Sequence, residues 1–95
     1  MFQKMEYQII VEKPSLEKIE TLGLDSWSFW ECEPSKFDWE YSSEETAYIL
    51  KGKVLVTPEN GEPVEINAGD LVVFPAGLKC TWEVIEKIEK KYKFN

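Results

Sequence analysis

The chain has no histidine and no arginine, and only two of its 95 residues are cysteine. Histidine is the side chain that titrates nearest neutral pH and the commonest metal ligand, so its absence removes both usual roles at once. The missing arginines remove the planar group that binds phosphate and carboxylate through paired hydrogen bonds. Eleven lysines stand against 18 acidic residues, a net charge of −7. That balance argues against a nucleic-acid-binding protein, because such proteins need a basic face.

The sequence also lacks the features of membrane and exported proteins. It contains no run of 18 apolar residues, which a membrane-spanning helix needs, and its first ten residues mix charges among the apolar positions, unlike a signal peptide. Cys32 and Cys80 form no CxxC pair, and secreted chains of this length usually carry more cysteines. We therefore expect a soluble cytoplasmic protein with two reduced thiols and no membrane partner.

The chain is expected to form one domain over residues 1–95, because 43% of its residues are hydrophobic and they include 4 Trp, 4 Tyr and 5 Phe. Short apolar or alternating segments separated by turn residues predict seven to nine strands, as in an antiparallel barrel or sandwich. The predicted strands cover residues 7–11, 27–32, 37–41, 46–57, 64–66, 71–74 and 80–85, with 86–95 as a last strand or a frayed end.

One short helix is predicted near the N-terminus. Ser15 suits the N-cap position and Gly23 suits the end of a helix. Between them Leu16, Ile19 and Leu22 recur at helical spacing. Two helical turns are unstable on their own, so we expect this apolar stripe to pack against another part of the structure.

Two further local signals concern the strands themselves. Asn60-Gly61 predicts a hairpin with a type I′ turn, which needs positive φ angles at both residues, and Gly52 inside a long strand segment predicts a bend. Residues 37–41 alternate strictly between aromatic and acidic side chains. A strand period of two places the aromatic residues on one face and the carboxylates on the other.

Two segments carry a resemblance to a known family. Cupins share the motif G-x5-H-x-H-x3–4-E-x6-G and, later in the chain, G-x5-P-x-G-x2-H-x3-N. Glu45 and Gly52 match the end of the first motif, and Gly69, Pro75 and Gly77 match the second. The opening glycine of the first motif is absent.

The metal-binding histidines of these motifs are replaced. Trp39 and Tyr41 stand at the first two histidine positions, Cys80 at the third, and Val84 where asparagine is expected. The spacing of the motifs is therefore kept while most of their metal-ligand chemistry is lost.

The chain thus resembles the cupins, which implies an all-β, RmlC-like jelly-roll barrel with one short N-terminal helix. The patterns Trp-x-Tyr, Glu-Thr-x-Tyr-x-Leu-x-Gly and Phe-Pro-x-Gly-x-x-Cys-x-Trp further resemble small stand-alone cupins of the (S)-ureidoglycine aminohydrolase C-terminal-domain type. Stand-alone members of that group mostly have no assigned activity, so the resemblance implies a fold and not a reaction. Cupins commonly dimerise through a sheet face, so a homodimer is expected.

In a cupin the ligand positions point into the barrel. The resemblance therefore implies that Trp39, Tyr41, Glu45 and Cys80 face one cavity, joined by Trp82, which lies two residues beyond Cys80. Aromatic faces at these positions suit a flat or sugar-like ligand. The alternative is that they fill the barrel, as side chains often do in small barrels.

Three functions remain open from the sequence. The first is a barrel that binds a sugar- or ureide-like small molecule. The second is an enzyme on a small polar metabolite, with Glu45 as the catalytic acid or base. The third is a filled barrel that acts as a structural or interaction module. Any divalent metal would be held by Glu45 and Cys80, but two ligands are fewer than the three or four of stable sites. We therefore expect no cofactor, with Cys80 a weak ligand, a reactive thiol or a small buried apolar residue.

Overall fold

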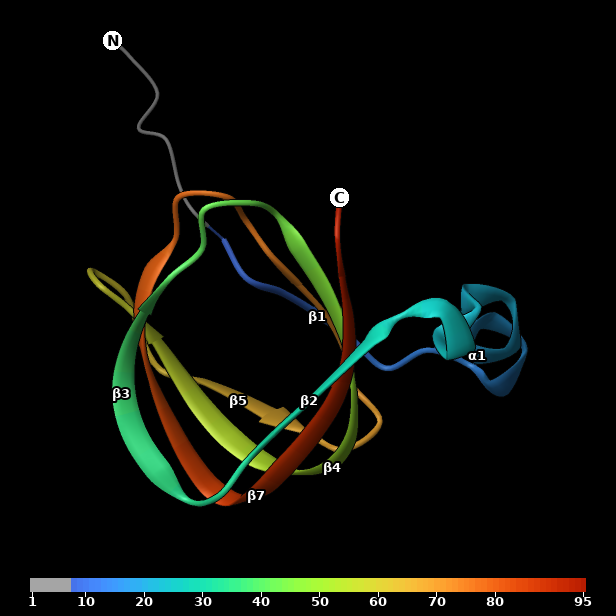
Figure 1. Ribbon diagram of the computed structural model, residues 1–95. Helices are drawn as coiled ribbons and strands as arrows, with labels where there is room; N and C mark the ends of the chain where they lie inside the picture. Colours follow the sequence, from blue (N-terminus) through green and yellow to red (C-terminus); the bar gives the residue numbers. More distant parts are fainter. Residues whose placement is uncertain (1–7) are drawn as a thin grey trace, which may run out of the picture.

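The computed structural model describes residues 8–95, which form seven strands, one α-helix and one short 3-10 helix (Figure 1). No helix in this range is long and apolar enough to cross a membrane. All strand pairs are antiparallel. The elements in chain order are β1 (Ile10–Glu12), α1 (Leu16–Leu22), η1 (Leu24–Ser26), β2 (Ser28–Cys32), β3 (Ser35–Glu40), β4 (Glu45–Pro58), β5 (Val64–Asn67), β6 (Leu71–Phe74) and β7 (Lys79–Phe94).

The two long strands, β4 and β7, pair with each other along the barrel wall (Figure 1). Residues 45–51 of β4 pair with 89–94 of β7, and this half is extended by β6 and β1 on one side and β2 on the other. Residues 53–58 of β4 pair with 80–86 of β7, and this half is extended by β5 and β3. The two halves share β4 and β7, so the sheet curves around a single interior.

Gly52 allows β4 to bend where the two halves join. The register with β7 shifts between Ile49 and Val54, and Gly52 has a φ of 97°. A Cβ atom at this position would lie 2.1 Å from the backbone carbonyl oxygen of Lys87. Both the backbone angle and the close approach of β7 therefore require glycine.

The interior between the halves is packed with apolar side chains. Inward positions alternate along β4 and β7, as the strand period requires. The resulting core consists of Tyr41, Ala47, Ile49, Val54, Val56, Ile66, Val72, Phe74, Leu78, Cys80, Trp82, Val84 and Ile88.

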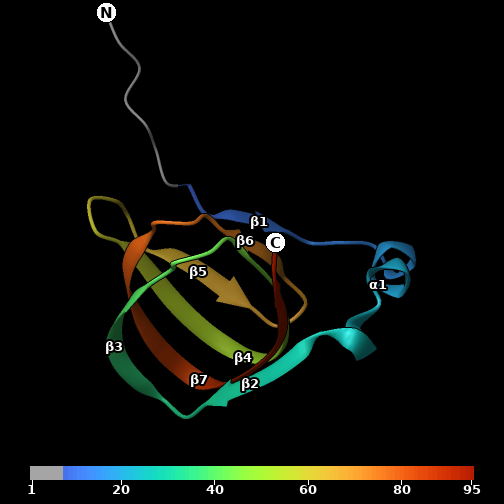
Figure 2. The ribbon, with the colours of Figure 1, turned by 45° about the horizontal axis from the view of Figure 1, so that its top comes forward.

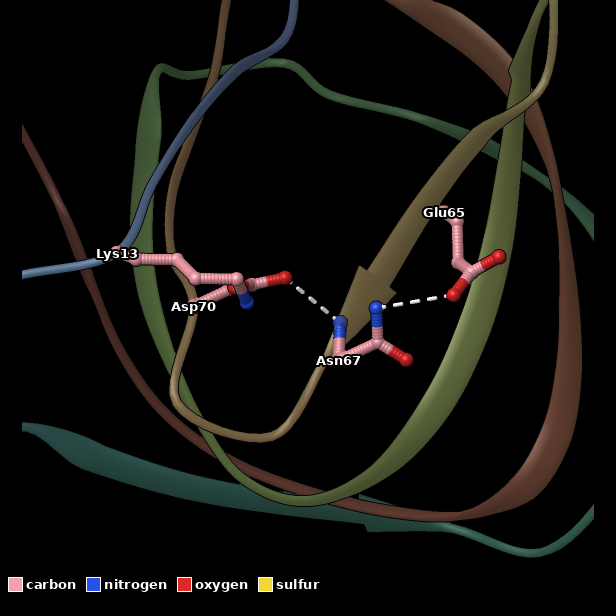
Figure 3. Close-up of polar contacts among 4 residues, drawn as sticks. All are labelled: Lys13, Glu65, Asn67 and Asp70. Carbon is pink, nitrogen blue, oxygen red and sulfur yellow. Dashed lines mark hydrogen bonds and ion pairs between the residues drawn. The ribbon is translucent and has the colours of Figure 1, made fainter.

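A buried carboxylate fixes the segment between β1 and α1 to the barrel (Figure 3). Asp70 accepts a hydrogen bond from the backbone N–H of Asn67 at 2.8 Å and forms an ion pair with Lys13. The side-chain amide of Asn67 donates in turn to Glu65. Because Lys13 follows directly after β1 and Asp70 directly precedes β6, this pair holds the short edge strand against its neighbour.

The predicted helix is present with the predicted ends. The Ser15 side chain accepts a hydrogen bond from the backbone N–H of Lys18, and Gly23 adopts the left-handed conformation that ends the helix. The expected packing of its apolar stripe is present only in part: Ile19 and Leu22 are half-buried, whereas Leu16 is 80% exposed and no residue of α1 is fully buried. Figures 1 and 2 both show α1 set apart from the barrel wall.

Several strand boundaries differ from those expected. The first strand begins at Ile10, and the predicted residue Tyr7 lies outside the described residues. The last segment is a strand rather than a frayed end, because β7 continues to Phe94 along β4 and β2. The predicted strand at residues 80–85 and this last segment are one continuous strand, β7, whereas the breaks predicted between the earlier strands occur.

The type I′ turn predicted at Asn60-Gly61 is wrong. The turn closes with a hydrogen bond from the Gly61 N–H to the Pro58 carbonyl, but neither Asn60 nor Gly61 has a positive φ. The β4–β5 pairing ends at Val56 and Val64, while β4 continues to Pro58 in its ladder with β7. The resulting longer connection does not need the tight two-residue turn.

Candidate functional site

A cavity of about 270 Å³ lies at one end of the barrel, between β2, β3 and the paired ends of β4 and β7. Its deeper walls are buried side chains, whereas Trp39 and Phe94 are more than half exposed and lie at its rim. The residues lining it are Trp30, Phe37, Trp39, Tyr41, Glu45, Trp82, Lys90, Tyr92 and Phe94.

The aromatic alternation of residues 37–41 builds one wall, as predicted. Phe37, Trp39 and Tyr41 all line the cavity. Phe37 is opposite Trp82 in the β3–β7 ladder, and their rings stack with their centres 6.1 Å apart. The ring of Phe74 lies behind that of Tyr41 and parallel to it, and the two ring centres are 4.7 Å apart. The wall is therefore a cluster of packed aromatic rings, some stacked and some edge-on.

A buried ion pair forms part of the cavity wall. The Nζ atom of Lys90 lies 2.6 Å from Oε2 of Glu45, and both side chains are almost fully buried. Glu45 is at the start of β4 and Lys90 is on β7, and the two strands pair in the half of the barrel that includes β2. Burial lowers the pKa of Lys90, while the carboxylate of Glu45 acts to raise it.

Aromatic rings surround the ammonium group of Lys90. Its Nζ atom lies 5.0 Å from the ring centres of both Trp30 and Trp82, 5.3 Å from that of Tyr92 and 5.8 Å from that of Phe74. The negative faces of aromatic rings attract a cation at such distances. The rings and Glu45 together replace the water that a surface lysine would have.

Two polar atoms in the cavity walls have no hydrogen-bond partner among residues 8–95: the hydroxyl oxygen of Tyr41 and the indole nitrogen of Trp82. Both side chains are only 2% exposed. Burial, Glu45 and Cys80 raise the pKa of Tyr41; the Trp82 indole N–H acts to lower it as a weak donor near the phenol oxygen, although the pair does not meet the geometry of a full hydrogen bond. The Tyr41 hydroxyl is therefore a neutral donor at physiological pH, and Trp82 places a second donor close to it.

The backbone fixes Tyr41 in this position. Its N–H donates to the Leu78 carbonyl at 2.9 Å, and its own carbonyl accepts from the Gly77 N–H at 2.6 Å. The loop after β6 that carries the second motif therefore holds the residue that ends β3. This explains in physical terms why the two motifs occur together.

Cys80 differs from the other predicted site residues. Trp39, Tyr41, Glu45 and Trp82 line the cavity together, whereas Cys80 is not in its lining. The thiol donates a hydrogen bond to the Trp39 carbonyl at 3.6 Å, and Cys80 lines an adjoining open hollow of about 600 Å³. Burial, followed by the nearby charge of Asp38, raises the pKa of Cys80 to about 11, so the group stays a thiol at neutral pH. Cys32 is also a free thiol.

The residues of the cavity do not fit a bound metal ion of the kind that the cupin motifs imply. Tryptophan and tyrosine occupy two ligand positions, Glu45 is already paired with a cation, and the Cys80 thiol lies outside the lining. No group of three or more His, Cys, Asp or Glu residues in the described range is placed to hold a metal.

The sequence-based site omitted Lys90, together with the lining residues Trp30, Phe37, Tyr92 and Phe94. A signal for Lys90 was present: Ile88, Tyr92 and Phe94 alternate with a period of two, and this period includes position 90. The inward side of β7 therefore contains one lysine among apolar residues. A lysine in such a position needs a buried carboxylate, and Glu45 supplies it.

Comparison with known proteins identifies relatives of the chain. The EutQ-like cupin domain matches residues 19–92. A DUF861 family protein from Thermotoga maritima is 48% identical, with a TM-score of 0.90 over 93% of this chain and 100% of its own. The EutQ protein of Clostridium difficile is 25% identical, with a TM-score of 0.62 over 67% of this chain and 50% of its own. No curated protein matches the sequence.

A further solved structure extends the likeness. A protein of unknown function (DUF1255) from Acidithiobacillus ferrooxidans is 25% identical, with a TM-score of 0.64 over 66% of this chain and 60% of its own. The all-β jelly-roll barrel with one short helix, predicted from the two motifs, is confirmed. The matched region contains the whole cavity lining except Phe94.

Proposed function

The chain belongs to the EutQ-like cupin family, and from this premise we propose that it binds a small molecule in the aromatic cavity. The observation that carries the proposal is the pair of buried, unpartnered donors, Tyr41 Oη and Trp82 Nε1, in the cavity wall. A buried polar group without a hydrogen bond costs about 1–3 kcal/mol. A ligand that accepts from both donors offsets that cost, whereas a solidly filled barrel leaves it uncompensated.

The size and walls of the cavity limit the ligand. Its volume of about 270 Å³ is below the usual range for drug-sized ligands, so the ligand is a metabolite of few heavy atoms. The aromatic walls, which include Phe37, Tyr41 and Trp82, favour a planar or ring-shaped body. Sugar-like and ureide-like molecules both have this shape, and the resemblance to ureidoglycine aminohydrolase-type cupins supports the ureide type.

A second candidate function is catalysis on a small polar metabolite. The observation that favours it is the Glu45–Lys90 pair in the cavity wall, where one side chain can accept a proton that the other releases. In this case Glu45 is the acid or base, and no step requires a metal ion. Turnover of a bound compound that stops in Glu45→Gln, while binding persists, separates this function from simple binding.

The indole N–H signals in a ¹H–¹⁵N NMR spectrum test the binding function. The chain has four tryptophans, and the variant Trp82→Phe assigns the Trp82 signal. A ligand drawn from a set of sugars, ureides and small acids is expected to shift this signal and to leave that of Trp27, which is not in the cavity lining, unchanged. A set in which every compound leaves the Trp82 signal in place, or moves both signals equally, contradicts the proposed function.

We also propose that the protein forms a homodimer. Support comes from α1, in which Leu16 is exposed and no residue is buried within the single chain. A helix of two turns gains most of its stability from packing, so this stripe needs a partner surface. A second copy of the chain supplies one without any further protein.

A further inference from the structure

Among the free polar groups of the cavity, hydrogen-bond donors outnumber acceptors. The indole N–H of Trp82 can only donate, and the Tyr41 hydroxyl has a proton without an acceptor. Lys90 has three N–H groups, one of which donates to Glu45. If the indole N–H turns toward the Tyr41 oxygen, the phenol proton still lacks an acceptor. The cavity therefore has an excess of donors.

Few acceptors line the cavity. Glu45 is the one carboxylate in the lining; its Oε2 atom accepts from the Lys90 ammonium at 2.6 Å, and its Oε1 atom has no partner among the described residues. A ligand with many hydroxyl or amine protons would find few acceptors within these walls. A ligand that supplies an oxygen acceptor matches the groups that are free.

The charges of the pair restrict the ligand further. Glu45 and Lys90 cancel each other, so the wall is neutral overall. Glu45 helps to raise the pKa of Tyr41, because a second negative charge beside this carboxylate is unfavourable. The same repulsion acts on an anionic ligand at the Tyr41 hydroxyl, and Lys90 repels a cationic one. An uncharged ligand avoids both penalties.

We propose that the cavity binds an uncharged carbonyl compound, such as an amide, a urea or a ketone, whose oxygen accepts hydrogen bonds from Tyr41 and Trp82. This inference rests on the proposed binding function and names its ligand class. The planar carbonyl group lies along the aromatic wall, and the Glu45–Lys90 pair closes the cavity beside it. Sugars are disfavoured, because each hydroxyl brings a proton as well as an acceptor.

Calorimetric titration with four compounds that share a phenyl ring tests this class: benzamide, benzyl alcohol, benzoate and benzylamine. Benzamide is expected to bind about tenfold or more tightly than each of the others, since it alone is an uncharged carbonyl. Tyr41→Phe and Trp82→Phe are each expected to weaken benzamide binding about threefold to tenfold. The matched control Tyr48→Phe removes a hydroxyl from a tyrosine that does not line the cavity, and is expected to leave binding unchanged.

The outcomes separate this inference from the function on which it rests. Tighter binding of benzylamine, benzoate or benzyl alcohol, or benzamide binding that Tyr41→Phe leaves unchanged, overturns the ligand class while binding in the cavity stands. Failure of all four compounds to bind the wild-type protein overturns the ligand class together with the proposed function. A melting curve for each variant confirms that it is folded, so loss of binding is not mistaken for loss of structure.

Discussion

Lys90 places its ammonium group 2.6 Å from the carboxylate of Glu45 in the wall of the barrel cavity, where both side chains are more than nine-tenths buried. Removal of one partner leaves an uncompensated buried charge, which usually costs about 3–5 kcal/mol. Replacement of both partners by apolar residues of similar size is often neutral or stabilising. The pair therefore contributes a specific arrangement of the cavity more than net stability.

Lys90→Met is expected to lower the free energy of unfolding by about 3–5 kcal/mol. The double variant with Glu45→Leu and Lys90→Met is expected to regain most of this lost stability. Urea unfolding of the wild type, both single variants and the double variant completes a double-mutant cycle. A Lys90→Met variant that unfolds within about 0.5 kcal/mol of the wild type would show that the pair is solvated, as surface ion pairs are.

Tyr41→Phe is expected to keep or increase the stability of the ligand-free protein, by up to about 1–3 kcal/mol, because it removes a buried hydroxyl that has no partner. Its stacking on Phe74 stays the same. The measurement is the melting temperature in the absence of ligand, with Tyr92→Phe as the matched variant. A clear drop in the melting temperature of Tyr41→Phe alone would mean that the hydroxyl is bonded within the protein.

Gly52→Ala and Gly69→Ala form a matched pair of backbone substitutions. Both glycines have a φ above 90°, but a Cβ at Gly52 meets the Lys87 carbonyl, whereas a Cβ at Gly69 has no atom within 4 Å. Gly69→Ala is expected to cost about 1–2 kcal/mol from the backbone angle alone. Gly52→Ala is expected to cost at least about 4 kcal/mol, since the two long strands must separate. Equal costs in urea unfolding would contradict the close approach at the bend.

Stability is expected to fall as the pH rises above about 9. Burial raises the pKa of Cys80 from 9.0 to about 11, so the unfolded chain loses this proton first, and the stabilisation present below pH 9 is lost as the pH passes through 11. The raised pKa of Tyr41 also makes stability fall as the pH rises above 10.0, the ordinary pKa of tyrosine. The lowered pKa of Lys90 has the opposite effect: it makes stability rise with pH below 10.5, the ordinary pKa of lysine.

The pH dependence of Cys80→Ala isolates the thiol. Unfolding free energies of this variant between about pH 8 and pH 11 are expected to fall less steeply than those of the wild type. Cys32→Ala, which changes the other free thiol, is the matched variant and is expected to keep the wild-type slope. Parallel profiles for Cys80→Ala and the wild type would show that Cys80 ionises equally in both states.

Leu16→Asp tests the proposed homodimer through α1. The substitution puts a charge on the exposed apolar stripe, while a carboxylate in the first helical turn favours the helix itself. Sedimentation equilibrium is expected to give the mass of two chains for the wild type and of one chain for this variant. Thr21→Asp, outside the stripe, is the control. A wild-type protein that sediments as a single chain would rule out the dimer.

The sequence predicted the barrel because its two motifs place glycine where the backbone needs it. Gly52 and Gly69 both adopt positive φ angles, and the loop at Gly77 holds Tyr41 in place. The short helix was also predictable, since Ser15 and Gly23 determine its ends locally. These features depend on neighbouring residues, which a motif records directly.

The site was only partly predictable, because its main contact joins residues 45 positions apart. The alternation along β3 placed Trp39 and Tyr41 correctly in the wall. The pairing of Glu45 with Lys90 depends on the register between β4 and β7, which neither motif specifies. The Asn60-Gly61 turn type was also not predictable, because it depends on where the β4–β5 pairing ends, and that pairing stops at Val56 and Val64 and leaves a longer connection.

The most direct test of the account is a crystal structure of the protein soaked with benzamide. We predict that the amide oxygen lies within about 3 Å of both Tyr41 Oη and Trp82 Nε1, with the Glu45–Lys90 pair intact beside it. An empty cavity closed by its own side chains, with Tyr41 and Trp82 bonded within the protein, would contradict the central claim that these walls are built to bind a small molecule.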